Sequence, residues 1–405
     1  MSLSREFLLR QAEEYSTPLY VYDGDMILDR YHRLFDFIKW PGLKVHFAMK
    51  ANSNLGILKL LNKAGAYLDT VSPGEVILGL KAGFPRERII YTANNLTEAE
   101  MHMVHEQGVL MNIGSVSRLA KFGKAFPGSE LCLRFNPDVR DGENERLMTA
   151  GDIAKFGILL DQVDKVRELA AKYNLKVVGL HEHTGSGIQD ESVYKSMKAL
   201  MGIATPENFP DLRFLDFGGG FKVPYKPDEK RIDYVKMGAE ITRLFTEFCD
   251  KYGRKLELRF EPGKYMVAES GYLLVQINTL KDNHGYLIAG CNSGFPQLIR
   301  PVFYGAYHHV RNLSNPDGAA NVYDVVGNIC ETGDYFAERR ELPEIREGDI
   351  LSIENAGAYC YSMGGFYNLR PMPAEVLVQN GEAKLIRRRI SFEDLANQVL
   401  AESAD

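Results

Sequence analysis

Short apolar runs alternate with amphipathic segments between residues 45 and 263, and this alternation is the strongest constraint on the fold. The runs have the length of buried β-strands, whereas apolar residues in the intervening segments recur every three or four positions, as in helices. The predicted strands cover residues 45–50, 67–71, 89–94, 110–114, 130–136, 176–183, 213–220 and 256–263, and the predicted helices include 55–64, 75–82, 98–106, 161–173 and 234–251. Eight such repeats predict an α/β fold built on a (β/α)8 TIM barrel, with an open doubly wound sheet as the alternative.

The pattern changes from residue 271 onward, where short β-rich runs follow one another with turn signals between them. These runs cover residues 272–278, 286–289, 322–326, 350–353 and 374–378. A chain of 405 residues usually holds more than one domain. We therefore expect a barrel over residues 25–270 and a mainly β C-terminal domain over 271–405, which the N-terminal segment 1–24 joins through a strand at 17–22.

The composition narrows the classes of partner. The formal net charge of −6 argues against nucleic acid or an anionic membrane as the main partner. No apolar stretch has the length of a transmembrane helix, and the first residues lack the pattern of a signal peptide. The five cysteines are widely spread without a CxxC pair, as expected of a protein in the reducing cytoplasm.

The carboxyl ends of barrel strands form the active-site face, and the unusual residues of this chain gather there. Lys50 ends the first predicted strand and Glu261 ends the eighth, while Asp69 and Arg134 lie on the second and fifth. Burial lowers the pKa of a lysine, which favours it as a Schiff-base nucleophile toward a carbonyl cofactor. The ordinary alternatives are a surface lysine at Lys50 and a structural salt bridge at Glu261.

Three glycines, Gly218 to Gly220, follow the seventh strand, where barrels commonly bind phosphate. A tight turn is the simpler explanation of three glycines, but Ser186 and Lys264 could add donors to the same phosphate. A phosphate site, an aldehyde partner in Lys50 and a partner for a pyridine nitrogen in Glu261 together describe pyridoxal 5'-phosphate (PLP).

The pair His181 and His183 offers a competing hypothesis, zinc ligation through an HxH motif. Such a site needs a third ligand, and no Cys, Asp or Glu cluster nearby supplies one. We therefore predict no metal site and expect His183 to lie against the cofactor ring.

Taken together, these motifs resemble those of the fold-type III PLP-dependent decarboxylases, and within them the diaminopimelate decarboxylases, over nearly the whole chain. The similarity rests on residues 47–52, 183–186, 218–220, 261–263, 298–301 with Tyr304, 330–334, 357–359 and 367–371. Each motif alone is modest, whereas their joint order is highly specific.

The resemblance implies a role for each site residue. Lys50 would bind the cofactor as a Schiff base, His183 would stack on its ring, and Glu261 would pair with its nitrogen. Phosphate and supporting contacts are implied for Asp69, Arg134, Ser186, Gly219, Gly220, Gly263, Lys264 and Tyr359.

Cys330 matches the residue that protonates the carbanion after carbon dioxide leaves, although a free cysteine is most often a buried small hydrophobe. In this family Cys330 and Glu331 would come from the neighbouring subunit. The resemblance therefore implies an obligate homodimer with shared active sites.

The predicted substrate is the small amino acid meso-2,6-diaminopimelate, which would yield L-lysine and carbon dioxide in the last step of lysine biosynthesis. Arg300 can bind its distal carboxylate bidentately, and Glu331, Lys264, Tyr304 and Tyr359 would assist. A merely structural role before Pro301 is the alternative for Arg300. The rival functions are decarboxylation of ornithine, lysine, arginine or carboxynorspermidine, racemisation, and regulation by an inactive PLP-binding protein.

Three positions depart from the family pattern. Lys264 stands where the family usually has arginine, Asn292 where an aspartate is common, and Phe47 where a tyrosine is frequent. An arginine at position 264 could bind an anion through two hydrogen bonds, whereas Lys264 offers a single point charge. None of the three removes a group that the reaction needs.

Overall fold

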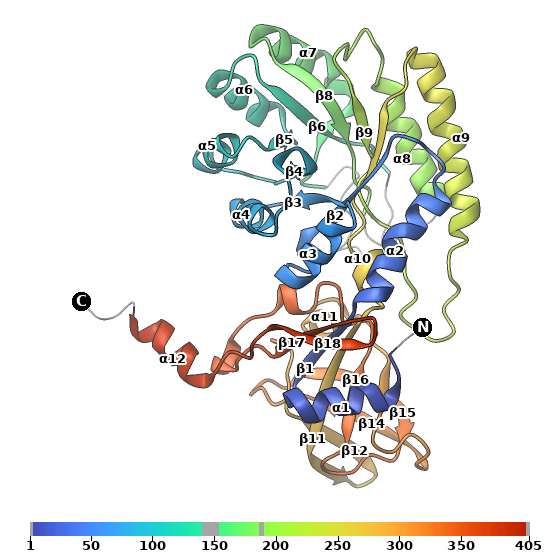
Figure 1. Cartoon of the computed structure of the whole chain (residues 1–405), viewed down its shortest axis with the longest axis vertical. Coiled ribbons are helices and arrows are strands. Elements are labelled where there is room, and N and C mark those ends of the chain that lie inside the picture. Colours follow the sequence, from blue (N-terminus) through green and yellow to red (C-terminus); the bar gives the residue numbers. More distant parts are fainter. Residues whose placement is uncertain (1–2, 140–153, 186–189, 402–405) are drawn as a thin grey trace.

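The computed structural model describes residues 3–139, 154–185 and 190–401. Two parts are stacked end to end in Figure 1, a barrel ringed by helices above and a mainly β domain below. The chain begins in the β domain, passes into the barrel through α2 (Gly24–Phe37) and returns to the β domain through β11 (Gly271–Asn283).

The barrel sheet is parallel and closed. Its eight strands are β2 (Leu43–Ala48), β3 (Tyr67–Thr70), β4 (Ile89–Tyr91), β5 (Leu110–Ile113), β6 (Glu130–Asn136), β8 (Lys176–His181), β9 (Phe214–Asp216) and β10 (Glu257–Phe260). Each pairs with the next, and β10 pairs with β2 to complete the ring. All eight predicted strands are confirmed, and a two-residue strand, β7 (Ile158–Leu159), adds to β6. The open-sheet alternative is wrong because the first and last strands are hydrogen-bonded to each other.

Helices pack around the barrel with their apolar faces inward. They are α2, α3 (Leu55–Lys63), α4 (Pro73–Lys81), α5 (Glu98–Glu106), α6 (Val116–Ala125), α7 (Val163–Lys172), α8 (Asp190–Ile203) and α9 (Tyr234–Tyr252). Several begin at a side-chain cap that satisfies a free backbone N–H, as Ser72 does for α4 and Thr97 does for α5. These caps fix where each strand-to-helix loop ends, and the loops carry the candidate site.

The second sheet is mainly antiparallel. It contains β1 (Leu19–Asp23), β11, β12 (Tyr286–Cys291), β13 (Val310–Asn312), β14 (Ala320–Val326), β15 (Tyr335–Pro343), β16 (Ile350–Ile353), β17 (Ala374–Gln379) and β18 (Glu382–Arg387). β1 lies between β11 and β17, antiparallel to the first and parallel to the second. The N-terminal strand therefore joins the second sheet, as expected. The domain limits 25–270 and 271–405 remain our proposal.

Short helices complete the described structure. The α-helices are α1 (Arg5–Tyr15), α10 (Lys264–Val267), α11 (Arg300–Tyr304) and α12 (Phe392–Ala401), and the 3-10 helices are η1 (Met49–Ala51), η2 (Arg86–Arg88), η4 (Leu160–Gln162), η5 (Tyr361–Met363) and η6 (Tyr367–Leu369). None of the described helices is both long and apolar enough to cross a membrane.

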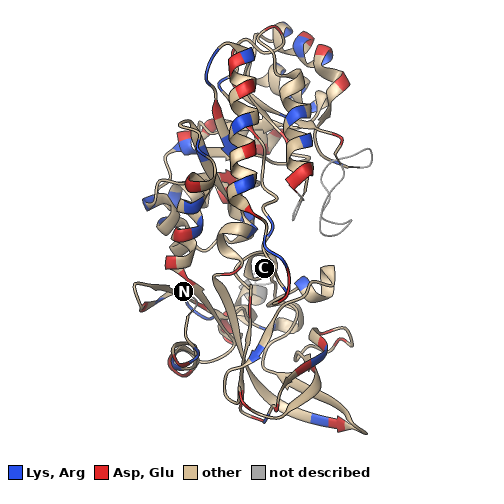
Figure 2. Cartoon of the chain, turned by 90° about the vertical axis from the view of Figure 1, so that its right-hand side faces the viewer, with Lys and Arg blue, Asp and Glu red and all other residues tan. Residues whose placement is uncertain are grey.

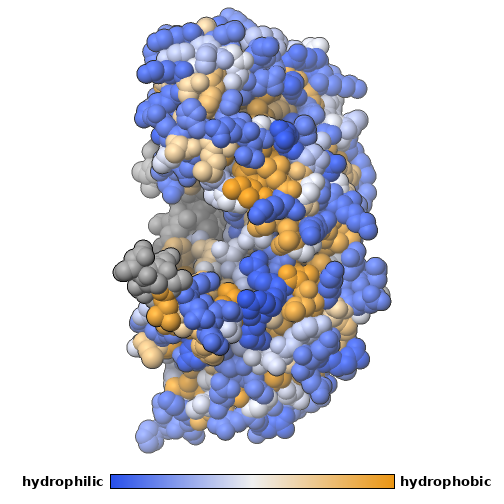
Figure 3. Space-filling view, turned by 60° about the vertical axis from the view of Figure 1, so that its left-hand side comes forward, coloured by the Kyte–Doolittle hydropathy of each residue, from blue (hydrophilic) through white to orange (hydrophobic). Residues whose placement is uncertain are grey.

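Charged residues of both signs are interspersed over the helices on the face drawn in Figure 2. Figure 3 shows another face, where the surface is recessed at the level between the barrel and the β domain and apolar residues form separate small patches.

Candidate active site

A cavity of about 420 Å³ lies where the carboxyl ends of the barrel strands face the second domain. It is lined by Ala48, Lys50, Val71, Thr92, Asn94, Arg134, Lys155, Phe156, His183, Gly219, Gly220, Phe221, Glu261, Gly263, Lys264, Arg300, Tyr304 and Tyr359. A larger hollow of about 730 Å³ lies along α2, where Glu269 forms ion pairs with both Arg30 and Arg231. The smaller cavity is the candidate site because it joins most of the predicted residues.

Lys50 lies in η1, directly after β2, with its side chain 38% exposed toward the cavity. Its Nζ is 3.4 Å from Oδ2 of the fully buried Asp69. Burial alone would lower the pKa of Lys50, but the charges of Asp69, Tyr359 and Glu261 raise that pKa above its ordinary value. The expectation of a lowered pKa was wrong for the protein without cofactor, because the strand ends bring carboxylates to the lysine.

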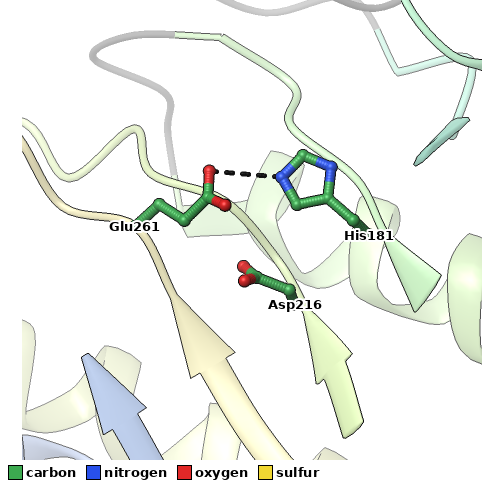
Figure 4. A group of neighbouring side chains, drawn as sticks. All are labelled: His181, Asp216 and Glu261. Atoms are coloured by element: carbon green, nitrogen blue, oxygen red, sulfur yellow. Dashed lines mark hydrogen bonds and ion pairs between the residues drawn. The ribbon is translucent and has the colours of Figure 1, made fainter. Parts of the chain in front are cut away.

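Three buried polar side chains, His181, Asp216 and Glu261, converge at the ends of β8, β9 and β10 (Figure 4). His181 Nε2 lies 3.2 Å from Oε2 of Glu261, and Asp216 lies beside this pair. Asp216 Oδ1 accepts a hydrogen bond from the backbone N–H of Gly218. All three side chains are at most 4% exposed.

Burial determines the protonation of this group. It raises the pKa of both carboxyl groups, and that of Asp216 rises well above its usual range. Lys50 and Arg134 oppose the increase at Glu261. Burial also holds the pKa of His181 well below its usual range. Burial therefore favours a neutral Asp216 and a neutral His181 that donates from Nε2 to Glu261.

Carboxylates do lie beside His181, so the expectation that it has none nearby was wrong. His181, Asp216 and Glu261 each offer a ligand atom within 4.8 Å of the others. The sequence could not reveal this cluster, because Glu261 comes from a strand 80 residues further along the chain. A hydrogen bond joins His181 to Glu261, and Asp216 lies beside this pair and accepts from the backbone of Gly218.

The glycine-rich loop and His183 form one wall of the cavity. The backbone N–H of Gly219 donates to Nδ1 of His183 at 3.1 Å, so the imidazole proton resides on Nε2. A Cβ on Gly219 would lie 2.6 Å from a backbone oxygen of Glu261. Only glycine lets the loop approach Glu261 this closely.

Tyr359 reaches the same wall from the second domain. Its backbone N–H donates to the carbonyl of Ala51, next to Lys50, and its φ of +57° is rare for a tyrosine. A Cβ on Gly263 would lie 3.0 Å from the Tyr359 hydroxyl. Ser186, also predicted for this wall, lies outside the described residues.

Arg134 is almost fully buried at the end of β6, and its guanidinium lies 4.5 Å from the ring centre of Phe156. Phe156 was not predicted, and no sequence signal marks it. Thr92 was also missed, although it follows β4 at the active-site face, where polar residues merit attention. Its hydroxyl lies 3.5 Å from Oε1 of Glu261.

Two buried cations also line the cavity. Arg300 begins α11 and is 3% exposed, and Lys264 begins α10 and is 5% exposed. Tyr304, in α11, lines the cavity beside them. The cavity therefore combines a lysine paired with a buried carboxylate and two further buried positive charges.

Cys330 and Glu331 stand apart from this set. Both are exposed, and neither is among the described residues that line the cavity. The backbone N–H of Cys330 donates to Oδ1 of Asn368, and the Tyr367 hydroxyl donates to Glu331 at 2.5 Å. The exposure of Cys330 excludes the alternative of a buried small hydrophobe within the single chain.

Of the three positions that depart from the family pattern, Lys264 lines the cavity, whereas Asn292 and Phe47 do not. Asn292 donates from its side chain to the hydroxyl of Thr17 and ties the N-terminal segment to the second sheet. Phe47 is fully buried in the barrel core.

These residues fit PLP. A lysine faces the cavity for the aldehyde, a buried carboxylate lies across from it for a ring nitrogen, and glycines that tolerate no side chain leave room for a phosphate. A neutral imidazole at His183 adds a flat surface between them.

Comparison with known proteins agrees with this fit. Residues 27–268 match a family described as the pyridoxal binding domain of pyridoxal-dependent decarboxylases. The chain is 40% identical to the diaminopimelate decarboxylase of Methanothermobacter thermautotrophicus, over 95% of this chain and 92% of that protein. The chain belongs to the diaminopimelate decarboxylase family. As a member of it, the protein is a PLP-dependent decarboxylase.

Solved structures of diaminopimelate decarboxylases share the whole architecture. One superposes with a TM-score of 0.91 at 33% identity, covering 98% of this chain and 97% of the other. The Helicobacter pylori enzyme, crystallised in complex with L-lysine, gives a TM-score of 0.89 at 29% identity, covering 98% and 100%. The family's barrel and β domain are thus both present here.

Proposed function

We propose that this protein removes carbon dioxide from meso-2,6-diaminopimelate to give L-lysine, the last step of lysine biosynthesis. The observation that carries the proposal is a cavity lined by Lys50, which pairs with the buried Asp69, and by the buried cations Arg300 and Lys264. Such a cavity suits an amino acid with a second carboxylate. The Helicobacter pylori relative was crystallised with L-lysine, the expected product.

Bound PLP would supply an electron sink for the electron pair left when carbon dioxide departs. Lys50 would hold its aldehyde covalently, with Asp69 beside the amine. Glu261 would face the ring nitrogen as an anion and keep that nitrogen protonated. His183 would lie against the ring, and Arg134 would support the cofactor from the side.

The phosphate would be held where backbone N–H groups and hydroxyls meet. Gly219, Gly220 and Gly263 line the cavity without side chains, and the Tyr359 hydroxyl lies close to Gly263. Ser186 and Lys264 would add further donors. The lysine at position 264 would contribute a point charge where an arginine would bind in two places.

At the substrate end, Arg300 would bind the distal carboxylate, with Lys264, Tyr304 and Tyr359 around it. A guanidinium suits a carboxylate and repels the terminal ammonium of ornithine or lysine. A solved lysine/ornithine decarboxylase shares the fold at 21% identity, a likeness that extends to the fold alone.

We further propose a homodimer in which Cys330 and Glu331 complete the site of the neighbouring subunit. Cys330 would deliver a proton to the carbon that has lost carbon dioxide, and Glu331 would receive the distal ammonium. Both are exposed, and neither lines the described cavity of its own chain. Exposed apolar side chains near them, Phe366, Tyr367 and Leu369, offer surface for a partner.

We place the enzyme in the cytoplasm, since all five cysteines are free thiols and four of them are buried. A reducing compartment would keep Cys330 available for its proposed role.

The decisive experiment measures carbon dioxide release by the PLP-loaded protein from meso-diaminopimelate, L-lysine, L-ornithine and L-arginine. We expect release from diaminopimelate alone, its loss in Lys50→Ala, and a rise in KM of at least tenfold in Arg300→Ala, because one desolvated ion pair disappears. Faster release from ornithine or lysine would favour the rival decarboxylases. Inversion without gas would indicate a racemase, and inactivity of a loaded, yellow protein would indicate a regulator.

A further inference from the structure

We propose that Tyr225 is a positioning residue for substrate specificity, which holds Arg300 in the orientation that binds the distal carboxylate. The inference rests on the proposed function and deepens it, because it assigns selectivity to a residue that does not line the cavity itself. Tyr225 lies in the segment between β9 and α9, in the barrel, whereas Arg300 begins α11 in the second domain. The contact between them therefore bridges the two parts of the molecule at the substrate end of the cavity.

Tyr225 contacts Arg300 in two ways. Nη1 of Arg300 donates a hydrogen bond to the Tyr225 hydroxyl, and the guanidinium carbon lies 4.6 Å from the centre of the tyrosine ring. Tyr225 is 9% exposed and Arg300 is 3% exposed, so water does not compete strongly for either group. A hydrogen bond and a ring contact together fix both the position and the tilt of a planar guanidinium.

The same ring also faces the second cation. Nζ of Lys264 lies 5.7 Å from the centre of the Tyr225 ring. Two buried positive charges near one another are unfavourable, and the negative face of an aromatic ring reduces that cost. Tyr225 thus keeps Arg300 and Lys264 together at a place where a carboxylate can meet both.

His308 supports the ring from its edge without adding charge. Its ring centre lies 5.4 Å from that of Tyr225 at an interplanar angle of 84°, and its Nδ1–H donates to the carbonyl of Glu354 at 2.8 Å. Burial, followed by the charge of Arg300, lowers the pKa of His308 to about 3, so the imidazole stays neutral. Because His308 is neutral, Arg300 and Lys264 are not joined by a third buried cation.

The backbone beside Tyr225 is also tied to the second domain. Nδ2 of Asn355 donates to the carbonyl of Pro224 at 2.9 Å. This bond holds the segment that carries Tyr225 against the domain that carries Arg300. The hydroxyl of Tyr225 therefore meets Arg300 from a fixed backbone, as expected of a positioning residue.

The test compares Tyr225→Phe with Tyr252→Phe in the PLP-loaded enzyme. Tyr252 is a matched control, because its hydroxyl also makes one buried hydrogen bond, to the carbonyl of Phe209, far from the cavity lining. We expect Tyr225→Phe to raise KM for meso-diaminopimelate about tenfold while kcat changes less than about twofold, since one hydrogen bond to a charged group is lost. Tyr252→Phe should leave KM unchanged.

A binding measurement isolates the distal carboxylate. L-Lysine, the expected product, keeps both the distal amine and the distal carboxylate, whereas 1,5-diaminopentane keeps the amine without the carboxylate. Tyr225→Phe should weaken inhibition by L-lysine about tenfold and leave inhibition by 1,5-diaminopentane within about twofold. Equal weakening of both inhibitors would overturn the assignment.

The cofactor absorbance and the melting temperature exclude a merely structural role. Both should match between Tyr225→Phe and Tyr252→Phe, and a selective loss of bound PLP in Tyr225→Phe would overturn the proposal. An unchanged KM in Tyr225→Phe would also overturn it. Failure of the proposed function looks different, because the unmodified enzyme would then release no carbon dioxide from diaminopimelate.

Discussion

Glu182 shows how burial affects the charge of an individual side chain. Glu182 follows β8 and is 1% exposed, with its carboxyl accepting a hydrogen bond from the Thr184 hydroxyl at 3.1 Å. Burial raises its pKa from 4.5 to about 7, although Thr184 and Arg134 favour the anion. The protein thus carries a carboxyl group that changes charge near neutral pH.

This shift predicts a pH-dependent stability. Because the folded pKa is raised, the folded state binds the proton more tightly than the unfolded state, and the contribution is fully present below pH 4.5. It is lost as the pH rises through about 7. Glu182→Gln should therefore gain stability relative to the unmodified protein between pH 5 and pH 8, by on the order of 2–3 kcal/mol. Melting temperatures at both pH values test this, and a constant difference between the two proteins would contradict it.

Asp216 gives a second prediction at this scale. If Asp216 is neutral, Asp216→Asn replaces one neutral hydrogen-bonding group with another, and melting temperature and PLP content should stay near those of the unmodified protein. Asp216→Ala removes the acceptor for the Gly218 N–H and should cost about 1–3 kcal/mol. Equal damage by both substitutions, measured by urea unfolding at pH 7, would indicate an ionised Asp216.

At the scale of elements, the loops after the strands carry the site residues, and the helices pack around the barrel. α2 and α9 pack closely because Gly238, in α9, lies against the end of α2. A Cβ at position 238 would lie 2.2 Å from the carbonyl oxygen of Phe37. No side chain fits there unless the two helices separate.

Gly238→Ala should therefore destabilise the protein by about 1–3 kcal/mol, the usual cost of overpacking a well-filled contact. Gly202→Ala is the matched control, because Gly202 lies in α8 and an added Cβ there meets nothing within 4 Å. Alanine favours helix over glycine, so the control should be neutral or slightly stabilising. Melting temperatures decide, and a similar loss in both variants would refute the packing argument.

At the scale of the whole molecule, the second domain is discontinuous in sequence. β1, from the N-terminal segment, lies between β11 and β17. The parts of the chain that precede and follow the barrel in sequence therefore form one sheet. The candidate cavity lies where this sheet's loops meet the barrel, and Arg300, Tyr304 and Tyr359 reach it from there.

The proposed homodimer leads to a complementation experiment. Lys50→Ala and Cys330→Ala chains should each be inactive alone, whereas a mixture that exchanges subunits should regain activity. With random pairing, half of the dimers are mixed and each has one intact site of two, so about a quarter of the unmodified activity should return. Carbon dioxide release measures this. No recovery, with subunit exchange verified by two different affinity tags, would contradict shared sites.

The sequence predicted much of this protein because the relevant patterns are local. Strand-sized apolar runs, helical periodicity and polar residues at strand ends are all properties of neighbouring residues, and all eight barrel strands followed from them. The same patterns placed Lys50, Arg134, His183, Glu261 and the glycines Gly219 and Gly220 at the active-site face, where they line one cavity, and they placed Asp69 beside Lys50.

Only the tertiary structure decided which of these groups meet and what charge they carry. Glu261 contacts His181 across 80 residues of sequence, and Arg300 contacts Tyr225 across 75, so no local pattern could reveal either pair. The pKa of Lys50 is raised, not lowered, because Asp69 lies 3.4 Å away at the end of the adjacent strand. Charge in a buried site depends on distance and desolvation, and both exist only after the barrel has closed.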